Sequence, residues 1–335
     1  MMTRLILALV IGFFLSSGFG AYLVPYLRKI KAGQSIKEIG PKWHMSKNGT
    51  PTMGGLMFIA AILVVTLTVG IPAMLAGNFT HIFVLLFGLV FGVIGFLDDY
   101  EKLKHKENTG LSAKAKFLLQ LVAAILFLVV LRLTGHLSYD LYIPFWNTYV
   151  TVPKIVYLVL AAFVVVGTVN AINLTDGIDG LATGTCIPVF LCFTAVAFCW
   201  GSGYEAQGVF SSGLTGALIG FLVYNFNPAK VFMGDTGSLF LGGCIAGLAF
   251  AIDCPLLLVP LCIMPIVETL SDIIQVGYFK LSHGKRIFKM APFHHHLEMG
   301  GFLGHKWKEK ELFCLFTGIT LVMAFVSILG VCNRF

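Results

Sequence analysis

Two adjacent carboxylates, Asp98 and Asp99, end a long apolar stretch in the segment "GFLDDYEKLKHKENTG", residues 95–110. Three lysines follow them at alternate positions, namely Lys102, Lys104 and Lys106. An ionised carboxylate at the edge of an apolar segment is tolerated when water, a metal ion or a basic partner accompanies it. The pair is therefore either the solvated end of a helix or part of a charged site.

Two further junctions between apolar and polar sequence also carry carboxylates. The side chains of interest are Asn173, Asp176 and Asp179 in "NAINLTDGIDGLATG", and Asn225, Lys230 and Asp235 in "NFNPAKVFMGDTGS". Taken singly, each has an ordinary explanation, because Asp and Gly form turns and an Asp can cap the start of a helix. Taken together, carboxylates at three separate junctions indicate a site that holds a hard divalent cation through oxygen ligands.

A hard cation with open coordination positions commonly serves phosphate chemistry, where it neutralises phosphoryl oxygens. Lysines near the carboxylates fit this chemistry, and Lys42 and Lys47 precede a further segment, "GTPTMGG", residues 49–55. Its backbone amides and threonines could approach phosphate oxygens. It is not a Walker motif, because the Gly-Lys-Ser/Thr ending is missing.

Three consecutive histidines, His294, His295 and His296, stand in "MAPFHHHLEMGG". Consecutive positions rarely direct three ligands to one face of a helix, so a zinc site is not favoured. Hydrogen bonding to phosphate or sugar, help with proton transfer, and an exposed polar loop all remain open. Glu268 and Asp272 lie four positions apart on one face of an apolar segment. Carboxylates there are functional by default, with structural pairing as the alternative.

The elements that must position these residues are membrane helices. The chain is 57% apolar and 12% charged with a mean hydropathy of +0.89, whereas soluble domains have about 25% charged residues. Apolar runs long enough to cross a hydrocarbon core of about 30 Å predict an all-α integral membrane protein of about ten transmembrane helices. The predicted helices cover residues 5–27, 53–75, 81–97, 117–133, 153–174, 181–200, 209–226, 239–252, 255–279 and 312–332. We expect one polytopic transmembrane domain, residues 1–335, whose site is formed by loops and helix ends.

Basic residues, which are retained on the cytoplasmic side of membranes, predict the orientation. Alternate loops hold all but four of the 23 Lys and Arg residues. These loops cover residues 28–52, 98–116, 175–180, 227–238 and 280–311. They are predicted to be cytoplasmic and both termini extracytoplasmic, so every candidate segment opens to the cytoplasm. The net charge of +7 suits anionic head groups or an anionic substrate, although ordinary membrane topology explains it equally.

Five segments carry a resemblance to a known family. They are "SKNGTPTMGG", "GFLDDYEK", "NAINLTDGIDGLATG", "VFMGDTGS" and "PFHHHLEMGG". In this order, from about residue 46 to 301, they resemble the bacterial phospho-N-acetylmuramoyl-pentapeptide transferases of the polyprenyl-phosphate N-acetylhexosamine-1-phosphate transferase superfamily. The histidine run and "GTPTMGG" favour the muramoyl branch over relatives that transfer other aminosugar phosphates. Ile178 stands where family members often have leucine.

The resemblance implies transfer of phospho-MurNAc-pentapeptide from UDP-MurNAc-pentapeptide to undecaprenyl phosphate, giving lipid I and UMP with Mg²⁺ as cofactor. It places the enzyme in the bacterial cytoplasmic membrane, with its active site facing the cytoplasm. The implied partners are the two substrates and membrane lipids. A homodimer is compatible with the resemblance, and no nucleic-acid partner is expected. Because both substrates are anions, a cation and lysines would offset their repulsion.

The resemblance also implies residue roles. Asp235 is the expected Mg²⁺ ligand, and Asp98 is the candidate for engaging or deprotonating the lipid phosphate, with Asp99 beside it and His294 as a further catalytic residue. A base is not obviously required, because a phosphate monoester is mostly dianionic near neutral pH. Covalent capture by an Asp therefore remains a second mechanism. The implied substrate-binding residues are Lys47, Thr52, Lys102, Lys114, Asn173, Asp176, Asp179, Asn225, Phe232, Gln275, His295 and His296, with Phe232 expected to stack on uracil.

Two other functions were weighed against this one. An anionic-solute transporter could also carry about ten helices, but its polar groups would lie near the midplane, often at broken helices in internal repeats. The polar segments here cluster at helix ends on one side. The nearer alternative is a GlcNAc-1-phosphate transferase of the same superfamily, which the choice of UDP-sugar would distinguish.

Overall fold

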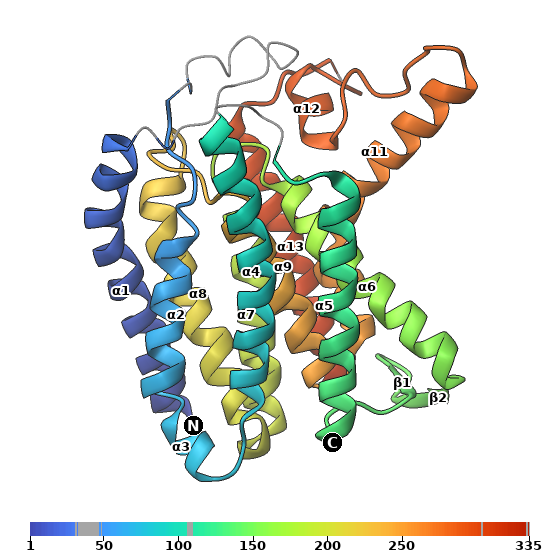
Figure 1. Cartoon of the computed structure of the whole chain (residues 1–335). Helices are drawn as coiled ribbons and strands as arrows, with labels where there is room; N and C mark the ends of the chain where they lie inside the picture. Colours follow the sequence, from blue (N-terminus) through green and yellow to red (C-terminus); the bar gives the residue numbers. More distant parts are fainter. Residues whose placement is uncertain are drawn as a thin grey trace.

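The long helices of the chain run side by side as one bundle (Figure 1). The computed structural model describes residues 1–30, 32, 47, 49–105, 110–302, 304–332 and 334. Among these residues, eight helices are long and apolar enough to cross a membrane. They are α1 (Met2–Lys29), α4 (Thr80–His105), α5 (Ala113–Leu133), α6 (Lys154–Thr175), α7 (Leu181–Trp200), α8 (Glu205–Asn225), α9 (Gly234–Ala251) and α13 (Glu309–Val331). The predicted class, an all-α integral membrane protein, is confirmed.

Shorter elements connect or extend these helices. They are α2 (Leu56–Thr68), α3 (Ile71–Leu75), η2 (Ser202–Tyr204), η3 (Pro255–Leu257), α10 (Leu258–Leu261), α11 (Ile263–Leu281) and α12 (Phe293–Glu298). One antiparallel hairpin, which the sequence did not predict, pairs β1 (Asp140–Ile143) with β2 (Thr148–Thr151).

Two of the ten predicted spans are interrupted in the structure. The segment 53–75 is divided into α2, which has 13 residues, and α3, which begins around Pro72. The segment 255–279 bends by 78° between Pro255–Leu261 and Ile263–Leu281. Proline explains both breaks, because Pro72 and Pro265 lack the N–H that would continue the preceding helix. The described residues therefore contain eight spanning helices, or nine if the bent pair is one span, and α2 is a shorter apolar helix.

Helix α4 is longer than the predicted segment 81–97, because it continues to His105. Asp98 and Asp99 therefore lie on a helix and not in the loop that follows it. Helix α9 likewise begins at Gly234 instead of residue 239, which brings Asp235 into its first turn. Both corrections concern helix ends that are polar yet packed inside the protein.

The core is formed by α8 and α9, the two most buried spanning helices. Small residues allow their neighbours to approach closely, as is common in membrane bundles. A β-carbon at Gly216 of α8 would overlap the backbone carbonyl of Leu9 in α1, and one at Gly95 of α4 would overlap the carbonyl of Asp235 in α9. Gly95 thus lets the end of α4 touch the start of α9.

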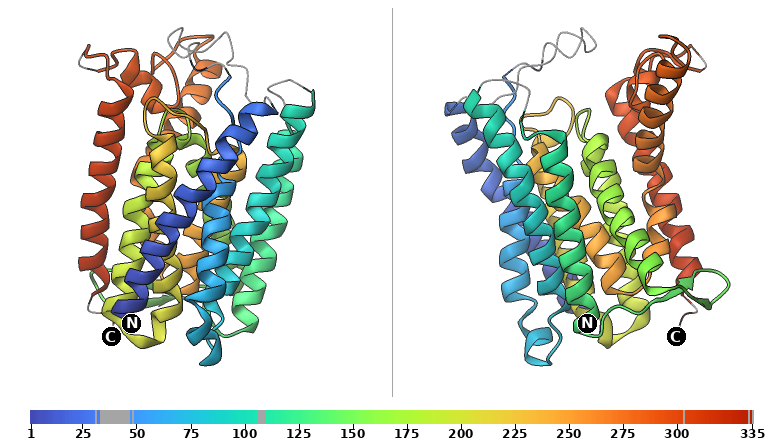
Figure 2. Two further views of the ribbon diagram at one scale, coloured as in Figure 1. Left: turned by 90° about the vertical axis from the view of Figure 1, so that its left-hand side faces the viewer. Right: turned by 45° about the vertical axis from the view of Figure 1, so that its right-hand side comes forward.

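Both chain termini lie at one end of the bundle, and the two further views agree (Figures 1 and 2). The C-terminal end of α4, the N-terminal end of α9 and the short helix α12 lie at the opposite end. The described parts of the lysine-rich loops therefore share one end, as predicted. The assignment of that end to the cytoplasm stays a prediction.

Candidate active site

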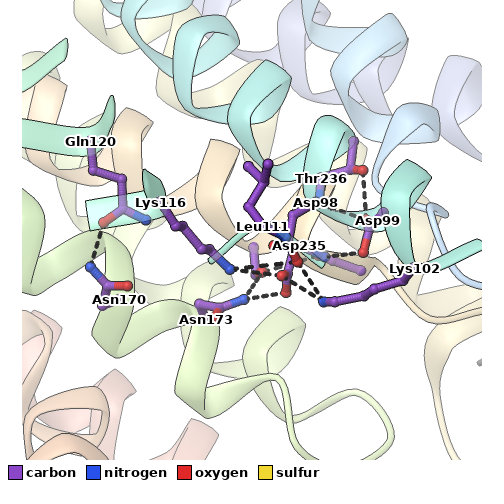
Figure 3. Close-up of polar contacts among 12 residues, drawn as sticks. Asp98, Asp99, Lys102, Leu111, Lys116, Gln120, Asn170, Asn173, Asp235 and Thr236 are labelled. Carbon is purple, nitrogen blue, oxygen red and sulfur yellow. Dashed lines mark hydrogen bonds and ion pairs between the residues drawn. The ribbon is translucent and has the colours of Figure 1, made fainter. Parts of the chain in front are cut away.

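Three carboxylates converge where α4 meets α9. Asp98 and Asp99 come from α4 and Asp235 from α9, and one ligand oxygen of each lies within 4.8 Å of the others (Figure 3). Asp98 and Asp99 are 3% and 0% exposed. Such a cluster of hard oxygen donors fits a divalent cation, so these residues could hold one.

Asp99 caps helix α9 from the neighbouring helix. Its Oδ2 accepts hydrogen bonds from the backbone N–H of Thr236 at 2.9 Å and from its Oγ1 at 2.7 Å, and its Oδ1 accepts from the N–H of Asp235 at 3.2 Å. Helix α9 has no side-chain cap of its own. A carboxylate at a helix start satisfies unpaired N–H groups and interacts favourably with the helix dipole. Asp99 therefore fixes the position of Asp235, and Asp235 does not cap its own helix.

Two lysines neutralise the other two carboxylates. Lys102 Nζ lies 2.6 Å from Asp98 Oδ2 and 2.9 Å from Asp235 Oδ2. Lys116 Nζ lies 2.7 Å from Asp235 Oδ2 and 3.9 Å from Asp98 Oδ2. Charge-assisted contacts of this kind are strong. The two ammonium groups thus contact the same oxygens that a cation would use.

Asn173 of α6 holds the remaining oxygen of Asp235. Its Nδ2 donates to Asp235 Oδ1 at 2.7 Å and to Ser238 Oγ at 2.8 Å. Asp98 is anchored separately, because its Oδ1 accepts from the N–H of Leu111 at 2.9 Å. Four helices, α4, α5, α6 and α9, therefore fix the charged cluster.

A cleft of about 680 Å³ opens beside the cluster. Its lining residues are Asp98, Lys102, Gly110, Leu111, Ser112, Ala113, Lys116, Asn173 and Asp235. The lining includes two carboxylates and two ammonium groups, so the cleft can bind a cation and an anion side by side. Concave sites with a few convergent polar groups are typical binding sites for small molecules.

The structure brings Lys116, and not the predicted Lys114, to the carboxylates. Lys114 is exposed on α5, whereas Lys116 points into the cleft. Residues two positions apart on a helix face different directions. Gln120, one turn beyond Lys116, is fully buried. The periodicity of α5 therefore contained a signal for Lys116 that the sequence interpretation missed. Lys104 is exposed, and Lys42 and Lys106 lie outside the described residues.

Lys47 and Asp179, both predicted to bind substrate, lie side by side and form an ion pair with each other. Lys47 Nζ is 2.6 Å from Asp179 Oδ1 and 2.6 Å from a carboxylate oxygen of Glu309. Glu309, the first residue of α13, was not among the predicted site residues. Asp176, three positions before Asp179, is partly buried. Its pKa is raised to about 8, mainly by burial and secondly by the negative charge of nearby carboxylates.

Two predicted substrate-binding amides hold loops through hydrogen bonds within the protein. Asn225 accepts from Thr183 Oγ1 at 2.7 Å and donates to the carbonyl of Val231 at 3.0 Å. Gln275 Oε1 accepts from the N–H groups of Ile287 and Phe288, at 3.2 and 3.0 Å. These contacts shape the segments beside the site. Direct contact of either amide with a substrate stays a prediction.

The segment "GTPTMGG" is hydrogen-bonded to the residues that directly precede helix α9 and Asp235. The amides of Gly54 and Gly55 donate to the carbonyls of Phe232 and Met233, at 2.8 and 3.0 Å, and Phe232 donates its N–H to Pro51 at 2.8 Å. The backbone N–H groups of Gly54 and Gly55 therefore donate to carbonyls within the protein and are not directed toward a phosphate. Thr52 is buried, and the Phe232 ring is half-buried; its stacking on uracil stays a prediction.

His294 is buried and held by Glu268 of α11. Its Nδ1 lies 3.0 Å from Glu268 Oε2, and its backbone N–H donates to the same carboxylate. Among the described residues its Nε2 has no hydrogen-bond partner. The ring lies against Gly177 of the Asp176–Gly180 loop, where a β-carbon would overlap Nε2. Glu268 thus fixes the ring. Of the two explanations considered for this carboxylate, the structure shows structural pairing, with His294 as the partner.

The other two histidines have separate partners. His295 Nδ1 lies 2.7 Å from Glu298 Oε2, and His296 Nδ1 accepts from the N–H of Lys289 at 3.0 Å. Burial, followed by the charge of Lys289, lowers the pKa of His296. Because the three rings have different partners, the histidine run has no shared metal geometry among the described residues.

Comparison with known proteins agrees with this site. Residues 81–253 match the family described as glycosyl transferase family 4. The membrane bundle, its charged cleft and this match define the chain as a membrane transferase of that class. Residues 47–59 also match phospho-N-acetylmuramoyl-pentapeptide-transferase signature 1.

Relatives with the same name cover nearly the whole chain. The phospho-N-acetylmuramoyl-pentapeptide-transferase of Clostridium acetobutylicum is 44% identical over 327 residues, 97% of this chain and 99% of the relative. That of Staphylococcus carnosus is 45% identical over 302 residues, 89% of this chain and 91% of the relative. The chain belongs to the phospho-N-acetylmuramoyl-pentapeptide-transferase family.

Proposed function

We propose that this protein transfers phospho-MurNAc-pentapeptide from UDP-MurNAc-pentapeptide to undecaprenyl phosphate, forming lipid I and releasing UMP. The observation that carries the proposal is the cleft in which Asp98 and Asp235 meet Lys102 and Lys116. Two anionic substrates can react only if positive charge offsets their repulsion. Relatives that are 44% and 45% identical over 97% and 89% of this chain bear the name of that activity.

Asp235 is the residue that would hold Mg²⁺, with Asp98 beside it and Asp99 fixing the helix start behind them. A bound Mg²⁺ would stabilise the charge that develops on phosphoryl oxygens. Lys102 and Lys116, which contact the same carboxylates, would supply N–H donors to phosphate oxygens of the substrates. Asn173 keeps Asp235 in place.

The chemical step is a direct displacement. An oxygen of the lipid phosphate forms a bond to the phosphorus that carries the sugar, and the bond from that phosphorus to the bridging oxygen breaks, so that UMP leaves with the bond electrons. The attacking phosphate is mostly dianionic near neutral pH. Asp98 therefore orients the nucleophile, or removes a proton from the singly protonated fraction.

A purified-protein assay tests the reaction. UMP release from UDP-MurNAc-pentapeptide is expected to require both undecaprenyl phosphate and Mg²⁺, and UDP-GlcNAc should give no release. Release from UDP-GlcNAc instead would assign the protein to the sister branch of the superfamily. A stoichiometric burst of UMP without the lipid, with a mass shift on Asp98 or Asp99, would establish the covalent mechanism.

The site end is proposed to face the cytoplasm of a bacterial cell. The concentration of Lys and Arg residues in the loops at this end supports the orientation, and nucleotide sugars are made in the cytosol. Single cysteines replacing Lys285 and Trp146, both exposed, test it in a background without the exposed native cysteines Cys199, Cys314 and Cys332. An impermeant thiol reagent outside intact cells should label the residue-146 variant and spare the residue-285 variant. The opposite labelling would invert the orientation.

A further inference from the structure

A cluster of positive charge lies at the end of helix α11, outside the cleft. Residues 273–297 contain four Lys or Arg residues and no Asp or Glu. Three of these cations, Lys280, Lys285 and Arg286, are exposed, and they have no carboxylate partner among the described residues. In contrast, Lys102 and Lys116 at the same end of the bundle are paired with carboxylates. Membrane topology alone explains positive charge at this end, but it does not explain why these three cations are unpaired.

Helix α11 presents apolar side chains outward. The face that is buried against the protein carries the polar residues Glu268, Ser271 and Gln275. The exposed side chains include Leu270, Ile273, Ile274, Val276, Phe279 and Leu281. A helix surrounded by water would bury such an apolar face against the protein instead. Hydrocarbon is therefore the surrounding that suits the outer face of α11.

The cations lie where this apolar surface ends. Helix α11 leans outward from the bundle at the end that carries α12 (Figure 1). Its last residue, Leu281, is 84% exposed, and Lys280 lies in the same last turn. Long basic side chains at such a boundary keep their stems on the apolar surface and extend their charged ends to the lipid head groups. The charged ends of the cluster can therefore reach the level of the head groups.

Hydrogen bonds fold the loop after α11 back onto the helix. The N–H of Gly284 donates to the carbonyl of Phe279 at 2.9 Å, and the N–H of Ile287 donates to Gln275 Oε1 at 3.2 Å. The two adjacent cations of the loop lie between these contacts and are thus held near the last turn of α11. Groups that are already held in place lose less conformational entropy when a ligand binds.

We propose that Lys280, Lys285 and Arg286 bind the head groups of anionic phospholipids in the bilayer around α11. The chemistry of the surface identifies this partner, because an apolar helix face continued by unpaired cations complements acyl chains continued by an anionic head group. Clusters of Lys and Arg at the end of a membrane helix are typical of binding to anionic lipids. A soluble anion would complement the charges and leave the adjacent apolar face without a partner.

A fluorescent probe attached at Leu281→Cys reports which lipids lie beside the cluster. The background lacks the exposed native cysteines Cys199, Cys314 and Cys332. The protein is reconstituted in vesicles of phosphatidylcholine and phosphatidylglycerol, and bromine on the acyl chains of one lipid or the other quenches the probe. We expect phosphatidylglycerol to bind beside the probe about tenfold more strongly than phosphatidylcholine, because each cation near an anionic surface strengthens binding by up to about fivefold. Raising the salt concentration from about 0.05 M to about 0.5 M should remove most of this preference.

The same probe at Leu75→Cys is the matched control. Leu75 is also 84% exposed, but it lies in α3 at the opposite end of the bundle, within a stretch, residues 48–97, that contains no Lys or Arg. The two lipids should quench this probe equally.

Replacing the three cations together identifies the residues that bind. The triple variant Lys280→Gln, Lys285→Gln, Arg286→Gln should lose the preference for phosphatidylglycerol at position 281. A second triple variant removes the same charge from three other exposed lysines at this end of the bundle, Lys104→Gln, Lys114→Gln and Lys306→Gln. It should keep most of the preference, because these lysines lie outside the cluster.

Equal quenching by the two lipids at position 281, with all three cations present, would overturn the proposal. So would a preference that survives high salt or the first triple replacement, and so would an equal loss in both triple variants, because total charge would then attract the lipid. An absent preference combined with a raised KM for the nucleotide substrate in the first triple variant would assign the cations to a soluble anion instead. If that variant does not accumulate, the salt titration with the cluster intact and the Leu75 control decide. The quenching needs no substrate, so its outcome is independent of the proposed function.

Discussion

Replacing Asp99 by Asn should damage both the fold and the activity, whereas replacing its neighbour Asp98 should damage activity alone. Asp99 accepts three hydrogen bonds at the start of α9, from the N–H groups of Asp235 and Thr236 and from the Thr236 hydroxyl. An Asn side chain can offer one acceptor oxygen to Thr236. Its NH₂ group would then face the N–H of Asp235, donor against donor, in a fully buried position.

The magnitude follows from these contacts. Loss of a helix cap costs about 0.5–2 kcal/mol, and a buried donor without an acceptor costs about 1–3 kcal/mol. Asp99→Asn should therefore lower the free energy of unfolding by roughly 1.5–5 kcal/mol in total. A helix start displaced by about 1 Å would also move Asp235, and a misplacement of that size can lower the rate about 10²-fold.

The assay is thermal unfolding of the purified protein beside UMP release, with Asp98→Asn as the control. Asp98 accepts from Leu111 and pairs with Lys102 but caps no helix. We expect Asp99→Asn to unfold several degrees below wild type and Asp98→Asn to unfold near wild type, with both losing activity. An Asp99→Asn protein of unchanged stability and abolished activity would refute the capping argument and indicate that Asp99 acts on the metal or substrate directly.

Three further predictions follow from the site. Asp235→Asn should raise the Mg²⁺ concentration for half-maximal activity about tenfold or more, because one ligand charge is lost; a metal titration checks this, and an unchanged curve would remove Asp235 from the ligands. Lys116→Met should lower kcat/KM about 10²-fold while Lys114→Met stays near wild type, and equal losses would contradict the assignment. The raised Asp176 pKa of about 8 means that the folded state binds a proton that the unfolded state releases above about pH 4. Stability should therefore fall as pH rises from about 4 to about 8, and the thermal unfolding of Asp176→Asn should lack that contribution; an identical pH profile would contradict it.

The membrane class and the end that carries the site could be predicted because both depend on local composition. Apolar runs identify helices without knowledge of their partners, and carboxylates beside lysines at their ends stand out against that background. The breaks before α3 and at α10 were also readable from Pro72 and Pro265, whose effect on a helix is local. They were missed because each apolar run was counted as a single span.

The roles of individual residues could not be predicted, because they depend on contacts between distant segments. Asp99 caps a helix whose first residues lie 136 and 137 positions away. Glu309 meets Lys47 across 262 positions. The residues on either side of Asp99 or Glu309 in the sequence do not indicate these partners. Lys116 was the exception, because the buried face of its own helix indicated its direction.

The pairing of charges explains why this site can form at the end of a membrane bundle. Asp98 and Asp235 neutralise Lys102 and Lys116 at contacts of 2.6 to 2.9 Å. An unpaired carboxylate or ammonium group so close to hydrocarbon would be costly. A divalent cation on the carboxylates would take over the role of the lysines and leave both ammonium groups to the phosphates. The charges of these four side chains thus cancel one another, and we predict that binding of a divalent cation and binding of an anion at this cluster strengthen each other.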